Sequence, residues 1–504
     1  MKLNYILFAI AFLFSCTRKN QENTPIIKEA TSAYQPTWES LKAHNEAPEW
    51  FQNAKFGIYF HWGVYSVPAF GDEWYPRHMH FEDREEYTHH LEKYGHPSKF
   101  GYHDFVPMFK AENFNAEEWA DLFQKAGARF AGPVAEHHDG FAMWDSDVTP
   151  WNAADKGPKK DITGELNTAL KARGLKLITT FHHAKHLQRY NNENTSPDER
   201  PYWDSHYPPF KDMPPSSEEQ DLKYLYGNLP EDEWLENIWL AKVNEVAKKY
   251  QPDIIWFDSW LDRIPETYRQ RMAADYLNEA KNWENEVVII RKQDDLPLDM
   301  SVDDLEKSRK NRLEEKSWMT DETISTGSWC YTEGLKIKPV KDVLHVLIDI
   351  VSKNGVLLLN ISPKANGTIP EEQKAVLLQI GEWLNKYGEA IYDTRPWYTY
   401  GEGPTKEPEG HFKNHSEFLK IKYSEKDFRY TTKGNIVYVT QLGTVVTGTK
   451  LVLNAFKEQK HKVADVIAMS DGSKVEWVQG EEGLSFTVPI SQDDNAPVYK
   501  VILN

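Results

Sequence analysis

Five short apolar runs in this sequence each end directly in a polar or aromatic cluster. The runs cover residues 55–60, 130–135, 174–181, 253–257 and 286–290. The clusters that follow them are His61-Trp62-Gly63, Glu136-His137-His138-Asp139, His182-His183, Asp258-Ser259-Trp260 and Arg291-Lys292. A short apolar run bounded by such residues is typical of a buried strand. The segments between the runs are long enough to hold helices. The order therefore predicts repeated βα units around one shared site, as in a TIM-like (β/α) barrel.

The 504 residues exceed one ordinary domain and favour a large barrel followed by an accessory domain. We assign residues 36–397 to the barrel, with helices over 116–126, 233–250 and 371–388 and with loops over 190–229 and 297–318. Residues 398–504 contain short strands separated by turn signals, at 428–430, 436–439, 463–467, 475–478 and 498–502. This pattern predicts a C-terminal antiparallel β-sandwich that packs against the barrel.

The N-terminal segment reads as an export signal. A basic start and a short apolar stretch lead to Cys16, so residues 1–16 resemble a bacterial lipoprotein signal with a lipid-attachment cysteine. The alternative is an ordinary secretory signal with an incidental cysteine. Residues 17–35 would form a flexible tether, and the exported chain would be lipid-anchored in the periplasm or at the outer-membrane surface. Cys330 is the other cysteine, so no intramolecular disulfide is expected once Cys16 is acylated.

Composition excludes some classes of protein. A net charge of −18 argues against a nucleic-acid partner, because phosphate binding needs clustered Lys and Arg. No Gly-rich phosphate loop and no G-x-S-x-G motif is present, which weakens nucleotide-dependent and α/β-hydrolase interpretations. The 18 tryptophans suit stacking on sugar rings, although most large aromatic residues fill cores.

Carboxylates near the strand ends suggest acid/base and nucleophilic chemistry. A retaining glycoside hydrolase needs two carboxyl groups roughly 5–5.5 Å apart. The candidates are Glu73, Asp139, Asp145, Asp258, Glu306 and Asp321. Asp258 stands at a strand end between Trp256 and Trp260, which would hold a nucleophile rigidly, although an Asp there could instead cap the next helix. The acid/base is harder to assign: Glu306 lies in a loop, and a loop carboxyl group can reach the site without its position being fixed by sequence.

The histidines allow three interpretations. His61, His137, His138, His182 and His183 could bind a metal, donate to sugar hydroxyls, or be buried and satisfied by the backbone. The helical H-E-x-x-H spacing is absent and adjacent histidines on a strand point to opposite faces, so we expect no metal and no other cofactor.

Longer motifs identify a family resemblance. The segments AKFGIYFHWGVYSVPA, HHDGFAMWDS, PDIIWFDSW, SWMTDETISTGSWCY and VSKNGVLLLNISPKANGTIP resemble the α-L-fucosidases of glycoside hydrolase family 29, in that family's order, over residues 50–397. The resemblance implies a TIM-like barrel, a β-sandwich and a retaining double-displacement mechanism without metal. It makes Asp258 the nucleophile and Arg291 a site arginine, and it places fucose contacts at His61, Glu73, Trp74, His137 and His138.

The resemblance leaves some positions open. Glu306 is the best match for the acid/base, with Glu314 and Glu315 as alternatives. His182 and Trp256 are added as substrate contacts from their places at strand ends. The family often has Lys where this chain has Glu136, and a Tyr-Tyr-Ser-like strand end where this chain has Phe181-His182-His183.

The resemblance predicts an exo-acting enzyme that removes terminal α-L-fucose from oligosaccharides or polysaccharides, with a membrane contact only through the anchor. Two other functions remain open from sequence: a non-catalytic fucose-binding lipoprotein, and an exo-glycosidase for a fucose-like sugar such as α-L-galactose.

Overall fold

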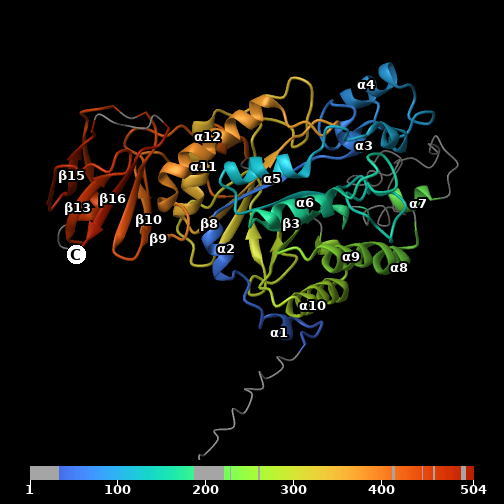
Figure 1. Cartoon of the computed structure of the whole chain (residues 1–504), viewed down its shortest axis with the longest axis horizontal. Coiled ribbons are helices and arrows are strands. Elements are labelled where there is room, and N and C mark those ends of the chain that lie inside the picture. Colours follow the sequence, from blue (N-terminus) through green and yellow to red (C-terminus); the bar gives the residue numbers. More distant parts are fainter. Residues whose placement is uncertain are drawn as a thin grey trace, which may run out of the picture. The chain divides into compact units, whose positions relative to one another are not determined.

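Eight parallel strands close into a barrel, which confirms the predicted TIM-like architecture (Figure 1). The computed structural model describes residues 33–504 except 185, 187–220, 227–228, 259–260, 411–414, 445, 458–459 and 490–494. The barrel strands are β1 (Phe56–Phe60), β2 (Phe130–Glu136), β3 (Lys176–Phe181), β4 (Ile254–Phe257), β5 (Val288–Arg291), β6 (Val302–Asp304), β7 (Trp318–Thr323) and β8 (Gly355–Ile361). The strands pair in sequence order and β1 pairs with β8.

Helices surround the barrel strands (Figure 1). The longer ones are α4 (Glu85–Lys93), α5 (Ala116–Lys125), α6 (Ile162–Ala172), α9 (Ala241–Tyr250), α10 (Glu266–Asn282), α11 (Val340–Ser352) and α12 (Glu371–Tyr387). The short ones are α1 (Trp38–Leu41), α2 (Glu49–Ala54), α3 (Tyr75–His78), α7 (Leu222–Leu225), α8 (Glu231–Trp234) and α13 (His415–Phe418). The three predicted helices are confirmed as α5, as α8 with α9 joined by a π-helical segment, and as α12.

Local sequence explains where several helices begin. The side chain of Asn115 accepts hydrogen bonds from backbone N–H groups at the start of α5, and the side chain of Asp161 accepts one at the start of α6. Helices α8, α10, α11 and α12 each begin directly after a proline. A proline there costs no helical hydrogen bond, because the first helical N–H groups have no partner within the helix.

Side chains alternate along every barrel strand. One buried cluster takes a residue from each of the eight strands and fills the barrel interior; it includes Tyr59, Val134, Ile178, Trp256, Ile290, Val302, Met319 and Leu358. Their neighbours in sequence pack outward against the helices, for example Phe60, Phe257 and Ile289. This two-residue period fixes which side chains beyond each strand end reach the space above the interior.

The loop predictions have different outcomes. An irregular loop over 297–318 is wrong for β6, which lies within that range, and for Trp318, which begins β7. Most of the predicted loop over 190–229 lies outside the described residues. The last part of the predicted loop holds α7. The signal, Cys16 and most of the tether also lie outside them.

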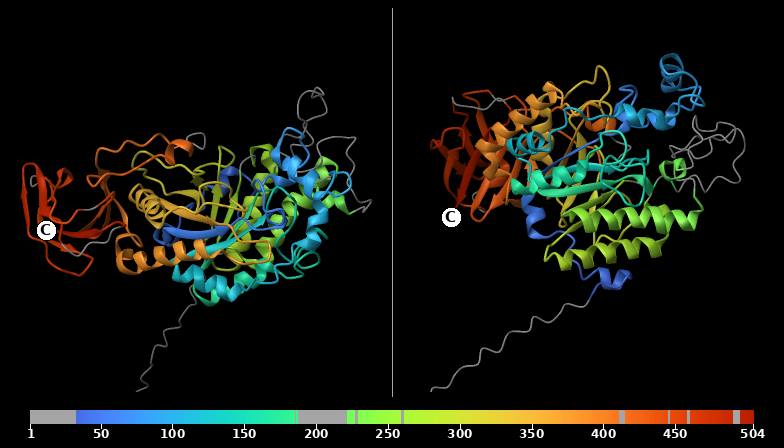
Figure 2. Two further views of the ribbon diagram at one scale, coloured as in Figure 1. Left: turned by 90° about the horizontal axis from the view of Figure 1, so that it is seen from above. Right: turned by 45° about the vertical axis from the view of Figure 1, so that its right-hand side comes forward.

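The C-terminal region forms two antiparallel sheets, as predicted. One has the order β13-β16-β11-β10-β9 and the other β12-β15-β14. Their bounds are β9 (Arg395–Glu402), β10 (Phe428–Lys433), β11 (Ile436–Gln441), β12 (Lys450–Leu453), β13 (Val463–Ala468), β14 (Trp477–Gly480), β15 (Gly483–Thr487) and β16 (Val498–Leu503). In Figure 2 these orange-to-red strands gather apart from the barrel strands. The two sheets share a buried core that includes Tyr430, Leu453, Phe486 and Val501, so they form a sandwich.

The sandwich packs on the barrel. Helix α11 contacts β9 and β10, and Tyr438, Leu442 and Val498 join the main barrel core. The predicted boundary after residue 397 falls inside β9. In the part of the chain that the structure describes, no helix has both the length and the apolar character needed to cross a membrane.

Candidate active site

Strand alternation carries chemistry-bearing residues into the space above the barrel interior. A side chain two or four positions beyond an interior residue continues on the same face. The residues placed in this way are His61 after β1, His182 after β3, Asp258 after β4, Lys292 after β5 and Glu306 after β6.

Strand β2 also brings a histidine to this space, through a shift in its pairing with β3. The register between β2 and β3 shifts between Val134 and Glu136. Glu136 then forms a fully buried ion pair with Lys242 of α9, at 2.8 Å, and His137 turns toward the pocket. The glutamate that precedes the histidine pair therefore has its lysine partner on α9.

One pocket of about 120 Å³ collects these residues. Its lining consists of His61, Glu73, Trp74, His137, His138, His182, Trp256, Asp258, Lys292, Glu306, Asp321 and Trp329. Apart from Arg291, every residue predicted to be catalytic or substrate-binding lies in this set. Lys292 and Trp329 were not predicted as site residues, and Asp321 was only one of several candidate carboxylates.

Asp258 is the most tightly held carboxylate of the pocket. Its side chain lies 3.0 Å from Lys292 Nζ, 3.3 Å from His138 Nε2 and 3.6 Å from His182 Nδ1. Burial alone would raise the pKa of Asp258, but Lys292 and the two histidines hold it well below its usual value. The carboxylate is therefore ionised, as a nucleophile must be.

Lys292 joins the two candidate catalytic carboxylates. Its Nζ lies 3.0 Å from Asp258 Oδ1, 3.0 Å from Glu306 Oε2 and 3.5 Å from Asp321 Oδ2. Burial would lower the pKa of Lys292, but these carboxylates raise it well above its usual value, so it stays charged. Because both oxygens lie 3.0 Å from one nitrogen, those of Asp258 and Glu306 are at most twice that distance apart. This close approach is compatible with the roughly 5–5.5 Å between the carboxyl groups of retaining glycosidases.

The alternative acid/base residues lie elsewhere. Glu314 pairs with Arg312 at 2.9 Å, and the side chain of Asn354 donates to the backbone carbonyls of Glu314 and Glu315. Neither glutamate lines the pocket. Among the three candidates, Glu306 alone lies beside Asp258.

The remaining carboxylates have other surroundings. Glu73 accepts from the backbone N–H of Trp329 at 3.2 Å, and burial raises its pKa to about 8. Asp321 accepts a hydrogen bond from Tyr59 Oη at 3.0 Å and lies 3.5 Å from Lys292 Nζ. Asp139 is buried outside the pocket against Tyr102, and Asp145 is exposed.

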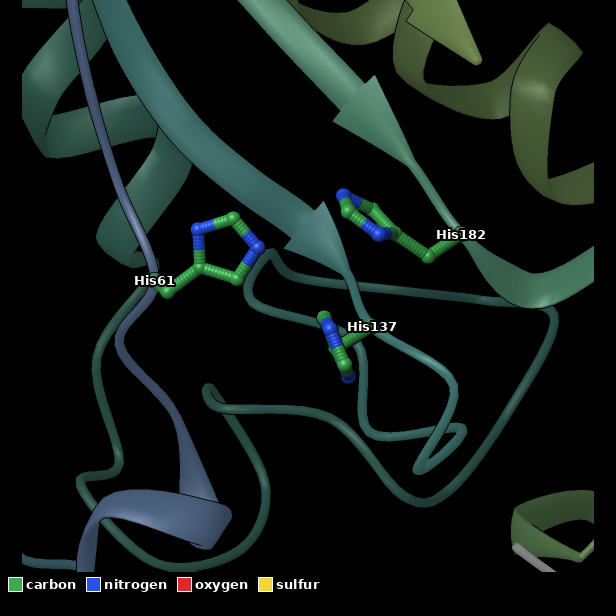
Figure 3. Close-up of side chains that lie close together, drawn as sticks. All are labelled: His61, His137 and His182. Carbon is green, nitrogen blue, oxygen red and sulfur yellow. The ribbon is translucent and has the colours of Figure 1, made fainter. Parts of the chain in front are cut away.

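Three histidines from neighbouring strand ends face one another (Figure 3). The rings of His61, His137 and His182 lie with centroids 4.7–5.4 Å apart. His61 Nδ1 is hydrogen bonded to Asn360 Oδ1 at 2.8 Å, and burial together with His182 lowers the pKa of His61 well below its usual value. Their nitrogens, within 4.8 Å of one another, could either hold a metal or serve as donors and acceptors for hydroxyl groups.

Tryptophans wall the pocket. The ring of Trp74 lies 4.7 Å from that of His138, Trp256 lies 5.1 Å from His182, and Trp329 lies 5.2 Å from His61. They give a polar cavity an apolar lining on several sides. Trp260, which sequence placed beside Asp258, lies outside the described residues.

Arg291 does not line the pocket, contrary to expectation. It is the last residue of β5 and alternates with Ile290 and Lys292, so it leaves the barrel on the outer face. Its guanidinium donates to the carbonyl of Leu296 at 2.5 Å and lies 3.5 Å from Asp303. The sequence could have pointed to Lys292 as the site residue instead, because Lys292 follows the interior residue Ile290 by two positions.

Comparisons with known proteins show the family of this chain. The model of a family described as alpha-L-fucosidase matches residues 23–389. Tissue alpha-L-fucosidase of Rattus norvegicus is 30% identical over 92% of this chain and 90% of its own, and the Homo sapiens enzyme is 30% identical over 90% and 88%.

Solved structures agree as well. An alpha-fucosidase of Thermotoga maritima in complex with fucose is similar with a TM-score of 0.72 and 28% identity, over 93% of this chain and all of that one. The same enzyme with a mechanism-based inhibitor gives a TM-score of 0.73 and 29% identity over the same shares.

Proposed function

This chain belongs to the α-L-fucosidase family, and from that premise we propose that Asp258 is its nucleophile and Glu306 its general acid/base. The reaction is the hydrolysis of terminal α-L-fucosides with retention at the anomeric carbon. The single observation that carries the residue assignment is the ammonium of Lys292, which contacts both carboxylates at 3.0 Å.

The first step breaks the glycosidic bond. An ionised Asp258 attacks the anomeric carbon while Glu306 gives its proton to the departing oxygen, so a fucosyl ester forms on Asp258 and the aglycone leaves as an alcohol. In the second step Glu306 takes a proton from water, which displaces Asp258 from the sugar. Both carboxyl groups return to their starting states.

Sugar recognition falls to the histidines, Glu73 and the tryptophans. Fucose offers hydroxyl groups and a methyl group, which match a polar cluster facing an apolar wall. His61, His137 and His182 act in this proposal as hydroxyl partners and not as metal ligands. The pocket is also small: pockets for drug-sized ligands have volumes of roughly 300–1,000 Å³, so 120 Å³ suits one terminal sugar and exo action.

Paired variants test the assignment. Asp258→Ala should cut kcat on an aryl α-L-fucoside by orders of magnitude while the protein remains folded. Glu306→Ala should keep kcat/KM on a substrate with a good leaving group but lose kcat, because the second step lacks its base. Azide, which needs no general base, should restore kcat. Near wild-type rates for Asp258→Ala, or normal hydrolysis of natural linkages by Glu306→Ala, would contradict the roles. Matched aryl α-L-galactosides test the sugar preference; we expect the extra hydroxyl to be disfavoured by the apolar wall.

We also propose that the chain is exported and acylated at Cys16. The basic start, the apolar stretch and the cysteine at the end of the signal support this. Expression with a radiolabelled fatty acid should label the wild type but not Cys16→Ser. A wild-type chain that stays unlabelled would refute it.

A further inference from the structure

The loop that carries Glu306 is tied to the C-terminal sandwich through a buried ion cluster, and we propose that Arg309 is a positioning residue for Glu306. This inference rests on the acid/base role proposed above. It gives the sandwich a part in catalysis besides its packing against the barrel.

The loop after β6 is held at its start by β7. The backbone N–H of Leu305 donates to Met319 at 3.0 Å, and that of Lys307 donates to Asp321 at 2.8 Å. The hydroxyl of Thr320 donates to the carbonyl of Ser308 at 2.5 Å. The side chain of Glu306, by contrast, is 32% exposed, with Lys292 as its ion-pair partner. The placement of its carboxyl group therefore depends on where the loop backbone runs.

Arg309 anchors the far side of this loop. Its side chain is buried, with Nε 3.7 Å from Asp349 Oδ2 and the guanidinium 5.0 Å above the ring of Phe418. Asp349 is a fully buried residue of α11 and contacts Arg429 Nε of β10 at 2.5 Å. A path of two ion pairs thus runs from the loop to the sandwich.

The positive and negative charges of this ion cluster would be equal in number without Arg309. Asp349 also pairs with Lys353 at 2.8 Å, and Glu407, from the β9–β10 connection, pairs with Lys353 and with Arg429. Within the described residues these ion pairs join three cations to two carboxylates. Buried charges are costly unless they are paired, so neutralisation alone does not account for the third cation. What Arg309 adds is the connection to the catalytic loop.

A backbone contact supports the same connection independently. A Cβ placed on Gly410, in the β9–β10 connection, would lie 2.4 Å from the carbonyl oxygen of Arg309 and 3.1 Å from Leu305 Cδ1. The sandwich connection therefore lies directly on both ends of the segment that contains Glu306. Gly410→Ala should push this segment without removing any charge.

Leaving-group dependence separates positioning from stability. A misplaced Glu306 slows bond cleavage only where the departing oxygen needs a proton. Arg309→Met should lower kcat/KM for phenyl α-L-fucoside by about 10–100-fold, a part of what acid/base catalysis supplies. The 2-chloro-4-nitrophenyl fucoside needs little protonation and should keep most of its kcat/KM, with kcat partly restored by azide. Gly410→Ala should behave in the same way.

Thr431→Val is the matched control. Thr431 lies on β10 near Arg429, and its hydroxyl bonds the carbonyl of Ala390 at 2.7 Å, away from the catalytic loop. It should change both substrates equally or not at all.

Equal losses on both substrates, or no loss on either, in Arg309→Met and Gly410→Ala would overturn the proposal. If Arg309→Met does not fold, Gly410→Ala decides. Glu306→Ala separates this result from a failure of the proposed function. If Glu306→Ala shows leaving-group dependence and the two positioning variants show none, only the positioning role is overturned. If Glu306→Ala itself shows no leaving-group dependence, the acid/base role of Glu306 is overturned.

Discussion

Replacing Lys292 with methionine should move the acidic limb of the pH–rate profile toward higher pH. Lys292 Nζ lies 3.0 Å from Asp258 Oδ1, and both side chains are about nine-tenths buried. At an effective dielectric constant of about 20, two unit charges this close attract by about 5 kcal/mol. His138 and His182 remain beside Asp258 in the variant, so only part of this energy is lost.

The direction follows from the state that reacts. In the proposed mechanism Asp258 must be ionised to attack, and Lys292 favours the ionised form. Loss of Lys292 should therefore raise the pKa of Asp258 and remove activity at low pH first. A nearby opposite charge lowers a carboxyl pKa by about 1–3, or about 1.4–4 kcal/mol. The acidic limb of kcat/KM should therefore rise by about one to three pH units, with a much smaller loss on the plateau.

The assay is kcat/KM for an aryl α-L-fucoside between pH 4 and 8, with thermal unfolding measured at each pH. Lys292→Arg keeps the charge and is the matched control; its limb should stay near that of the wild type. A Lys292→Met profile that superimposes on the wild type, or an equal shift in both variants, would refute the reasoning.

Three further predictions concern Glu73, Glu136 and metal dependence. Burial raises the pKa of Glu73 to about 8, so its carboxyl group is neutral at pH 7. Glu73→Gln should keep most of the activity at pH 6 and should lack any decline that the wild-type rate shows above about pH 8. A wild-type decline above pH 8 that persists in Glu73→Gln would count against titration of Glu73. Glu136→Gln strands the buried Lys242 and should lower the free energy of unfolding by about 3–5 kcal/mol in urea titrations; a loss below 1 kcal/mol would contradict the stranded charge. Dialysis against EDTA should leave kcat unchanged, because we propose that His61, His137 and His182 bind sugar hydroxyl groups and no metal. Loss of activity on dialysis and its recovery on adding Zn²⁺ would contradict that proposal.

The apolar runs of β1 to β5 were readable because their buried residues are continuous and their ends are polar. Strand β6 has only three residues, two of them aspartates, so no apolar run marks it. Its place comes from backbone pairing with β5 and β7, which sequence patterns do not reveal. Strand β8 is apolar except for Asn360 and ends in Ser362-Pro363, so a search for polar clusters directly after apolar runs passed over it.

Site residues were predictable where they continue the interior face of a barrel strand beyond its end. His61, His182 and Asp258 continue the interior face of their strands, and the structure brings them together. Arg291 was favoured over Lys292 by resemblance, although the two-residue period after Ile290 points to Lys292. The proposed anchoring of Glu306 involves Arg309, Asp349 and Arg429, which are far apart in sequence, and no local pattern connects them.

The most direct test of the account is to identify the residue that becomes fucosylated. Incubation with 2-deoxy-2-fluoro-L-fucosyl fluoride should leave a long-lived sugar ester, because the fluorine slows its hydrolysis. Mass spectrometry of a peptic digest should find the added mass on the peptide that contains Asp258, with no adduct in Asp258→Ala. An adduct on Glu73, Glu306 or Asp321, or inactivation with no adduct on the protein, would contradict the assignment of Asp258 as nucleophile.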